Sequence, residues 1–183
     1  MGCDPPAVTE PPPIVDDDVQ VEELEDPEVP PGQMPGGSWL PPVVGIITSG
    51  FGVRDDGMMH DGVDLRASIG TVVNAPTDMI IRAVGYEQKA GRYIIADTVR
   101  DVGNSIGWKL TFAHLSHVDV FEDQRVAKGA PIALTGLSGA VTGPHLHFRI
   151  ERLDHTLLGG EKRTAVDPLS VMPLEQLVGG WMH

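Results

Sequence analysis

Residues 143–151, with the sequence GPHLHFRIE, hold the side chains that have the most to offer chemically. Polar and apolar residues alternate along this stretch, and the polar positions are His145, His147, Arg149 and Glu151. A period of two predicts a half-buried β-strand, with apolar side chains on a core and polar ones in a groove or in water. Two imidazoles two residues apart would point into the same space, which suits a metal site or proton transfer.

A second candidate group lies far upstream in residues 60–65, HDGVDL. His60 and Asp64 are four residues apart, so they share one face of either a helix or a strand. With one histidine of the later pair they would supply two nitrogen ligands and one oxygen ligand, and catalytic zinc sites commonly have three protein ligands. A single histidine is more often an ordinary surface or core residue. Four of the seven histidines, however, lie in short patterned contexts: His60, His114, His145 and His147.

The composition divides the chain of 183 residues into unequal parts. Residues 1–42 contain ten of the 26 acidic residues, eleven of the sixteen prolines and no lysine or arginine. Such a segment cannot bury enough apolar surface to fold alone, so we expect an extended or polyproline-like arm. We expect a folded domain over residues 43–172, followed by a short C-terminal tail over residues 173–183.

Short β-type segments separated by glycine-rich turns follow the arm. They lie at residues 43–48, 71–75, 79–84, 93–99, 108–114 and 131–134. Residues 101–105 predict a hairpin loop, and residues 153–165 predict an excursion from the domain. No convincing amphipathic helix occurs before residue 170. We therefore expect an all-β fold, a compact and mostly antiparallel sheet or sandwich.

Membrane and cysteine signals are sparse. No run of eighteen apolar residues occurs, so we expect no transmembrane segment. We recognise no basic and apolar signal peptide in the residues before the expected domain. Cys3 is the only cysteine, which excludes an internal disulfide and a cysteine-ligated zinc site.

Five motifs in a fixed order carry a family resemblance. They are SGFGVR (49–54), HDGVDL (60–65), GTVVNAP (70–76), FAHL (112–115) and TGPHLHF (142–148). Each motif alone is weak, but together, in this order and with glycines between them, they are specific. Over about residues 49–172 the sequence resembles the lysostaphin-type zinc metallopeptidases, which cut peptide bonds in bacterial peptidoglycan.

The resemblance implies a role for each matched residue. His60, Asp64 and His147 match the zinc ligands, with one zinc ion per chain. His114 and His145 match two further active-site histidines that do not ligate the metal. The implied reaction is direct attack of water on the peptide carbonyl, with histidine as acid or base.

Smaller details of the motifs allow weaker expectations. Ser138 and Thr142 lie in the glycine-rich loop before the histidine pair, where we expect them to line the substrate. Phe112 stands where the family often has tyrosine, and Met79 where it often has glycine. Neither departure touches a predicted ligand.

The function that we expect is a zinc-dependent endopeptidase acting on peptidoglycan cross-links. Since no signal peptide is recognisable, we expect a phage virion protein of the tail tip or baseplate that docks into the particle through residues 1–42 and acts at the host cell wall or periplasm. A bacterial envelope murein endopeptidase is the alternative. Two further rivals are a degenerate relative that activates another enzyme and a structural protein with an idle site. We expect no nucleic-acid partner.

Overall fold

The computed structural model describes residues 39–99, 106–155 and 161–172. Almost all of the predicted arm, the predicted tail over residues 173–183 and the predicted hairpin loop at 101–105 lie outside the described residues. None of the helices in the described part has the length and apolar character needed to cross a membrane.

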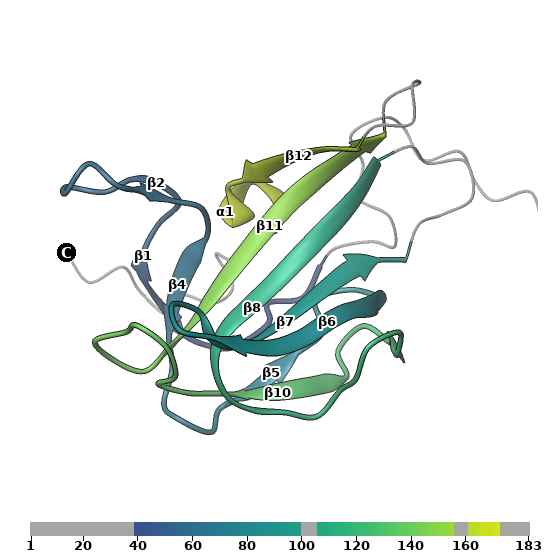
Figure 1. Ribbon diagram of the computed structural model, residues 1–183, viewed down its shortest axis with the longest axis horizontal. Helices are drawn as coiled ribbons and strands as arrows, with labels where there is room; N and C mark the ends of the chain where they lie inside the picture. The colour runs from purple at the N-terminus through teal and green to yellow at the C-terminus, as the bar shows by residue number, and fades with distance from the viewer. Residues whose placement is uncertain (1–38, 100–105, 156–160, 173–183) are drawn as a thin grey trace, which may run out of the picture.

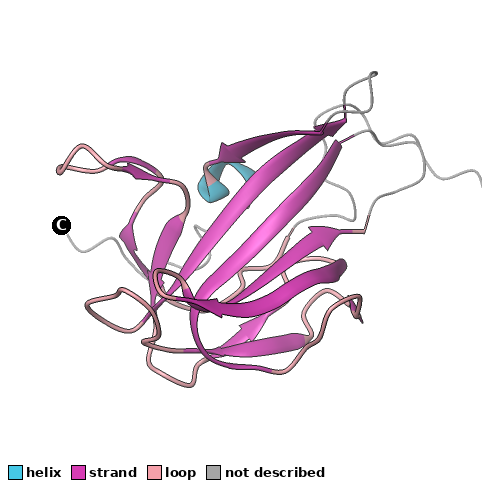
Figure 2. Ribbon diagram, viewed as in Figure 1, coloured by secondary structure: helices cyan, strands magenta, loops and turns pink. Residues whose placement is uncertain are grey.

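Strands make up nearly all of the regular structure in the described part (Figure 2). They are β1 (Ile46–Ser49), β2 (Gly52–Val53), β3 (Met59–His60), β4 (Val63–Arg66), β5 (Val72–Asn74), β6 (Met79–Glu87), β7 (Gly91–Thr98), β8 (Ile106–Val118), β9 (Arg125–Val126), β10 (Pro131–Thr135), β11 (His145–His155) and β12 (Glu161–Val166). One short helix, α1, spans Pro168–Val171. The all-β prediction is confirmed.

One large sheet organises these strands in the order β1-β4-β11-β8-β7-β6-β9 (Figure 1). Every pairing in it is antiparallel, including that of β12 with β11 and those of β10 with β5 and β8. β2 and β3 form a separate small hairpin. The long strands β11 and β8 run through the middle of the sheet. β11 lies between β4 and β8, so its side chains on each face have neighbours from both strands.

The predicted alternation in residues 143–151 is confirmed, because Leu146, Phe148 and Ile150 of β11 are fully buried. The predicted excursion at residues 153–165 is wrong: β11 continues to His155, and β12 pairs back along it. The sequence of β12, EKRTAV, is mostly polar and lacks a clear apolar period, so it does not predict a strand, yet β12 pairs with the edge of β11.

The last element of the described part is α1, a single turn that begins at Pro168. It begins two residues before position 170, the point before which we expected no amphipathic helix. Asp167 caps this helix, since its side chain accepts a hydrogen bond from the N–H of Leu169. Pro168 follows at the first helical position, where its fixed φ and missing N–H cost nothing. An Asp-Pro pair is thus enough to start this single turn.

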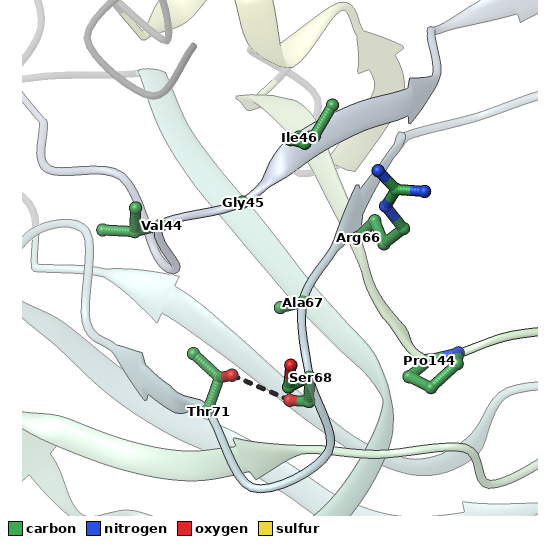
Figure 3. Close-up of a pocket in the computed structure, with 8 residues that line it drawn as sticks. All are labelled: Val44, Gly45, Ile46, Arg66, Ala67, Ser68, Thr71 and Pro144. Atoms are coloured by element: carbon green, nitrogen blue, oxygen red, sulfur yellow. Dashed lines mark hydrogen bonds between the residues drawn. The ribbon is translucent and has the colours of Figure 1, made fainter. Parts of the chain in front are cut away.

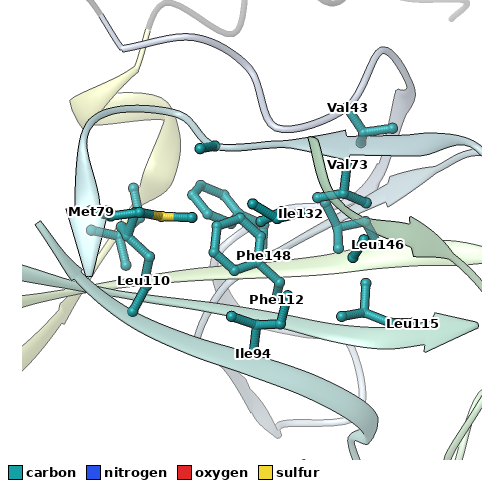
Figure 4. Packing of buried hydrophobic residues seen from close by; sticks show 14 of the residues in the cluster. Val43, Val73, Met79, Ile94, Leu110, Phe112, Leu115, Ile132, Leu146 and Phe148 are labelled. Atoms are coloured by element: carbon teal, nitrogen blue, oxygen red, sulfur yellow. The ribbon is translucent and has the colours of Figure 1, made fainter. Parts of the chain in front are cut away.

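The hydrophobic core lies on the face of the sheet opposite the polar side of β11 (Figure 4). Phe112 of β8 and Phe148 of β11 have ring centroids 5.2 Å apart. Ile132 of β10 and Val73 of β5, both fully buried, belong to the same cluster. Burying each such side chain contributes roughly 1.5–3 kcal/mol, so this core fixes which face of β11 points outward.

Trp39, a residue of the predicted arm, is also part of the core. Its side chain is 2% exposed. Its ring meets that of Trp108 edge-on, with centroids 6.1 Å apart at 83°. The next residue is held by a backbone hydrogen bond of 2.8 Å from the Leu40 N–H to the carbonyl of Pro76. The packed unit therefore includes residues from Trp39 onward.

We expect Trp39→Ala to lower the free energy of unfolding by about 3–5 kcal/mol, as for other buried tryptophans. Urea unfolding followed by circular dichroism measures this. Leu40→Ala is the matched control, because Leu40 is 41% exposed and its backbone bond survives the substitution. Equal effects of the two variants would mean that Trp39 does not belong to the core.

Candidate metal centre

The register between β4 and β11 brings the predicted metal ligands together. His147 lies directly opposite Asp64 in this antiparallel pair. Side chains of directly opposed residues share a face, with Cβ atoms about 4.5–5.5 Å apart. His60, at the end of the β2–β3 hairpin, completes the group, and its side chain is buried.

Three donor atoms form a small triangle. His60 Nε2 lies 3.1 Å from His147 Nδ1 and 3.2 Å from Asp64 Oδ1, and the last two atoms are 3.0 Å apart. Ligands about 2.0–2.1 Å from a tetrahedral zinc ion would be separated by about 3.3 Å. These residues therefore fit zinc in both donor type and spacing. They are also the one group in the described part of the chain that could hold a metal ion through three residues of this kind.

The SGFGVR motif orients His60. The Nδ1–H of His60 donates to the carbonyl of Gly50 at 2.6 Å, because a carbonyl can only accept. The lone pair of Nε2 then faces Asp64 and His147. A backbone carbonyl that accepts the other ring N–H is the usual way in which a metal-binding histidine is held in one tautomer and orientation.

Arg54, from the same motif, orients Asp64. Its Nη2 donates to Asp64 Oδ2 at 2.7 Å and its Nε donates to Ser49 Oγ at 3.0 Å. Oδ1 is left for the metal. Burial alone would raise the pKa of Asp64, but the hydrogen bond from His147 and the charges of the neighbouring imidazoles outweigh burial and lower the pKa. The group is thus a carboxylate at neutral pH, as a ligand must be.

Asp61 stands behind His147. Its Oδ1 lies 3.6 Å from His147 Nε2, and its Oδ2 accepts from Arg149 Nη1 at 2.9 Å. Arg149 Nη2 also donates to Glu151 Oε1 at 2.6 Å. The contacts therefore run from Glu151 through Arg149 and Asp61 to His147, a metal ligand, with acidic and basic side chains alternating along the way. Spacing within one strand could not reveal Asp61, whose partners lie more than eighty residues away.

Gly62 allows His147 to approach this closely. A Cβ at Gly62 would lie 2.9 Å from His147 Cε1 and 2.5 Å from the carbonyl oxygen of Phe148. Real Cβ atoms do not approach backbone oxygens so closely, so only glycine fits between the two ligands of the HDGVD motif.

His114 and His145 form the wall beside the triangle. Their rings lie 4.7 Å apart. The Nδ1–H of each donates to a carbonyl, that of Ser138 at 3.0 Å and that of Gly143 at 2.8 Å. Both imidazoles therefore keep Nε2 available, and His145 Nε2 is 3.6 Å from Asp64 Oδ1. The two histidines are brought to the site as predicted, and neither belongs to the three-residue metal group.

The backbone of His114 is unusual. Its φ is 63°, in the left-handed region that residues with a Cβ rarely adopt. The registers of β7 with β8 and of β8 with β10 both shift close to this position. Such strained positions cluster at functional sites. The irregularity turns a histidine toward the site directly after Ala113, the residue opposite His147.

The surroundings of His114 also change its acidity. Burial lowers the pKa of His114 below its usual value, against the opposing effect of the Ser138 carbonyl. The nearby imidazoles of His145 and His147 push the pKa in the same direction as burial. His114 is therefore neutral at pH 7, with an unprotonated Nε2 that can accept a proton.

The structure revises the expectation for Ser138. Its hydroxyl donates to the carbonyl of Leu115 at 2.7 Å and accepts from the N–H of Arg92 at 2.9 Å. Ser138 thus fastens the loop that holds His114, and its hydroxyl is not turned toward a substrate. Thr142 is exposed, which is compatible with the predicted lining role.

Comparisons with known proteins place this geometry in context. The sequence profile of Peptidase family M23 matches residues 58–168. The peptidoglycan DD-endopeptidase ShyB of Vibrio cholerae is 34% identical over 110 residues, 57% of this chain and 24% of that protein. The chain spans about a fifth to a quarter of the curated relatives that it matches.

Solved structures show the same fold. A zinc-containing peptidase from Vibrio cholerae superimposes with a TM-score of 0.54 at 31% identity, over 67% of this chain and 35% of that one. The antimicrobial peptidase lysostaphin from Staphylococcus simulans gives a TM-score of 0.58 at 27% identity, over 74% of this chain and 52% of that one.

We expect Asp64→Ala to purify with little zinc, because it removes one of three donor atoms and leaves two imidazoles without the carboxylate. Metal analysis of the purified protein measures this. Asp56→Ala is the matched control, since Asp56 is exposed and, among the described residues, its side chain accepts a hydrogen bond from the backbone N–H of Met58 and takes no part in the metal group. Full zinc retention in both Asp64→Ala and His147→Ala would contradict the assignment of the metal centre.

Proposed function

This chain belongs to Peptidase family M23, and on that premise we propose that it is a zinc-dependent endopeptidase that hydrolyses peptide bonds in bacterial peptidoglycan cross-links. His60, Asp64 and His147 form the zinc-binding site typical of the family. The single observation that carries the proposal is that a donor triangle of 3.0–3.2 Å lies beside two histidines with free Nε2 atoms. A domain that had lost catalysis would have no need to keep all five residues in this geometry.

When bound, zinc polarises the scissile carbonyl and lowers the pKa of a water ligand to about 7. The residues of the chain supply the rest. Neutral His114 accepts the proton of the attacking water at Nε2, since its Nδ1–H is committed to Ser138. His145, whose Nδ1–H is held by the Gly143 carbonyl, lies on the same wall. As an imidazolium it carries a second proton on Nε2, with which it can stabilise the developing oxyanion or which it can pass to the leaving amine.

Direct attack by water is the natural route for this site. The described domain contains no cysteine, and the hydroxyl of Ser138 is occupied by backbone groups. Within the described residues, neither a cysteine nor the Ser138 hydroxyl is therefore available to act as a nucleophile in place of water. Each histidine is assigned one proton-transfer or oxyanion role, and each role contributes a factor of about 10²–10³ to the rate.

The location that we favour is a phage virion, with the part of residues 1–42 that precedes Trp39 as the docking segment of a tail-tip or baseplate protein. Its support is composition: ten carboxylates and no basic residue would be repelled by the anionic wall, so substrate capture is a poor role for this segment. A bacterial envelope location is the alternative, supported by the peptidoglycan DD-endopeptidase of Vibrio cholerae among the relatives.

We expect His114→Ala and His145→Ala to retain zinc and to lose about 10²–10³ in kcat on purified peptidoglycan. Digests analysed by mass spectrometry report both the rate and the bond that is cut, while metal analysis reports occupancy. His117→Ala is the control, because the side chain of His117 is 63% exposed and its ion-pair partner in the described part of the chain is Asp119, which lies outside the metal group. If the wild-type protein with zinc bound opens no cross-link, the proposed activity is wrong. If either variant loses zinc as readily as Asp64→Ala, that histidine is a ligand.

A separate experiment tests the location. We expect mass spectrometry of purified phage particles to detect this chain, and a variant lacking residues 1–36 to cut peptidoglycan at about the full-length rate yet to be absent from particles. The deletion stops short of Trp39 because that residue belongs to the core. Recovery of the chain in bacterial envelope fractions and not in particles would favour the alternative. A large gain in rate on deletion would instead identify the arm as an inhibitor.

A further inference from the structure

A second row of side chains crosses the sheet beside the ligand row. Arg66 of β4 lies opposite Ile46 of β1 on one side and opposite His145 of β11 on the other. Because side chains alternate along a strand, Arg66 points to the same face as Asp64, two residues earlier. The three residues therefore stand side by side, next to the metal ligands and on the same face.

This row borders an open pocket of about 570 Å³ (Figure 3). Val44, Ile46 and Pro144 contribute apolar groups to the lining, and Arg66 is the one charged residue among the residues that line this pocket. Pro144 directly precedes His145. The pocket therefore adjoins the catalytic wall through two of its lining residues: Pro144, the chain neighbour of His145, and Arg66, the cross-strand partner of His145.

The lining of the pocket has two unusual chemical features. Val44 is 80% exposed and Ile46 is 49% exposed, so two aliphatic side chains that line the pocket are open to solvent. Arg66 is exposed too, and no acceptor or carboxylate in the described part of the chain contacts its side chain. By contrast, Arg54 and Arg149 are each held by a carboxylate at 2.9 Å or less.

We propose that this pocket is a substrate subsite, in which Arg66 binds a free carboxylate of the wall peptide and Val44 and Ile46 cover a short aliphatic side chain beside it. The inference rests on the proposed function and deepens it. A guanidinium binds a carboxylate through two parallel hydrogen bonds, which gives both strength and direction. Alanine-like residues that carry a free carboxylate combine the two chemistries that the pocket offers.

The position of Arg66 also limits where that carboxylate lies. Two residues along a strand span about 6.6 Å, so Arg66 is about that far along β4 from Asp64. An extended peptide covers the same distance in two residues. The recognised carboxylate therefore belongs to a residue within about two positions of the bond that is cut, which makes Arg66 a residue that selects the substrate.

The test compares soluble cross-linked muropeptides with the same muropeptides after carbodiimide coupling to ammonia, which turns their free carboxylates into neutral amides of similar size. We expect the wild-type protein to prefer the unmodified form by about 10-fold or more in kcat/KM, the size expected for a charge-assisted hydrogen bond. Arg66→Gln should reduce this preference to within about 2-fold without loss of zinc, while Arg66→Lys should keep part of it.

Arg125→Gln is the matched control, because Arg125 is an exposed arginine on β9, at the far edge of the sheet. It should leave the preference unchanged. Equal cleavage of both substrates by the wild-type protein would overturn the subsite while leaving the proposed activity intact. A rise in rate on both substrates in Arg66→Gln would also overturn it, because the pocket would then be occupied by an acidic segment of the chain itself. If no substrate, intact peptidoglycan included, is cut by the wild-type protein with zinc bound, the proposed function fails and the subsite fails with it.

Discussion

The antiparallel register of β4 with β11 is the constraint on which the rest of this structure depends. It sets Asp64 opposite His147 and Arg66 opposite His145. A slip of one residue would turn every polar side chain of β11 into the core and every apolar one into solvent. The buried side chains of Phe112 and the other core residues therefore matter for the metal site, although they do not contact it. Their burial keeps the opposite face of the sheet, which carries the ligands, pointing outward.

Polar contacts on the side away from the metal keep the ligands in place once the register is set. His60 donates to the Gly50 carbonyl, Asp64 accepts from the guanidinium of Arg54, and His147 lies beside the carboxylate of Asp61. Hydrogen bonds and ion pairs to the ligands fix the direction of each ligand and, for a histidine, its tautomer. In the described part of the chain, Arg66 has no such partner, whereas Arg54 is paired with Asp64. We therefore infer that Arg54 positions a ligand and that Arg66 is available to substrate.

The local sequence pattern predicts the fold class and the residues of the metal centre. The alternation around His147 predicts both the strand and its outward face, and the order of the motifs predicts the metal triad. Features that depend on distant pairing are not predictable in this way. The contact of Asp61 with Arg149, the left-handed backbone of His114 and the burial of Trp39 all need partners far along the chain. β12 was missed because a charged edge strand lacks a clear apolar period.

The metal centre is tested most directly by a crystal structure of the zinc-loaded protein, with anomalous scattering recorded on both sides of the zinc absorption edge. We expect one strong anomalous peak per chain, bound by His60 Nε2, Asp64 Oδ1 and His147 Nδ1. His114 and His145 should lie outside the coordination sphere, each with its Nδ1–H still donating to its carbonyl. A zinc peak elsewhere, or one coordinated by His145 in place of His147, would contradict this assignment of the ligands.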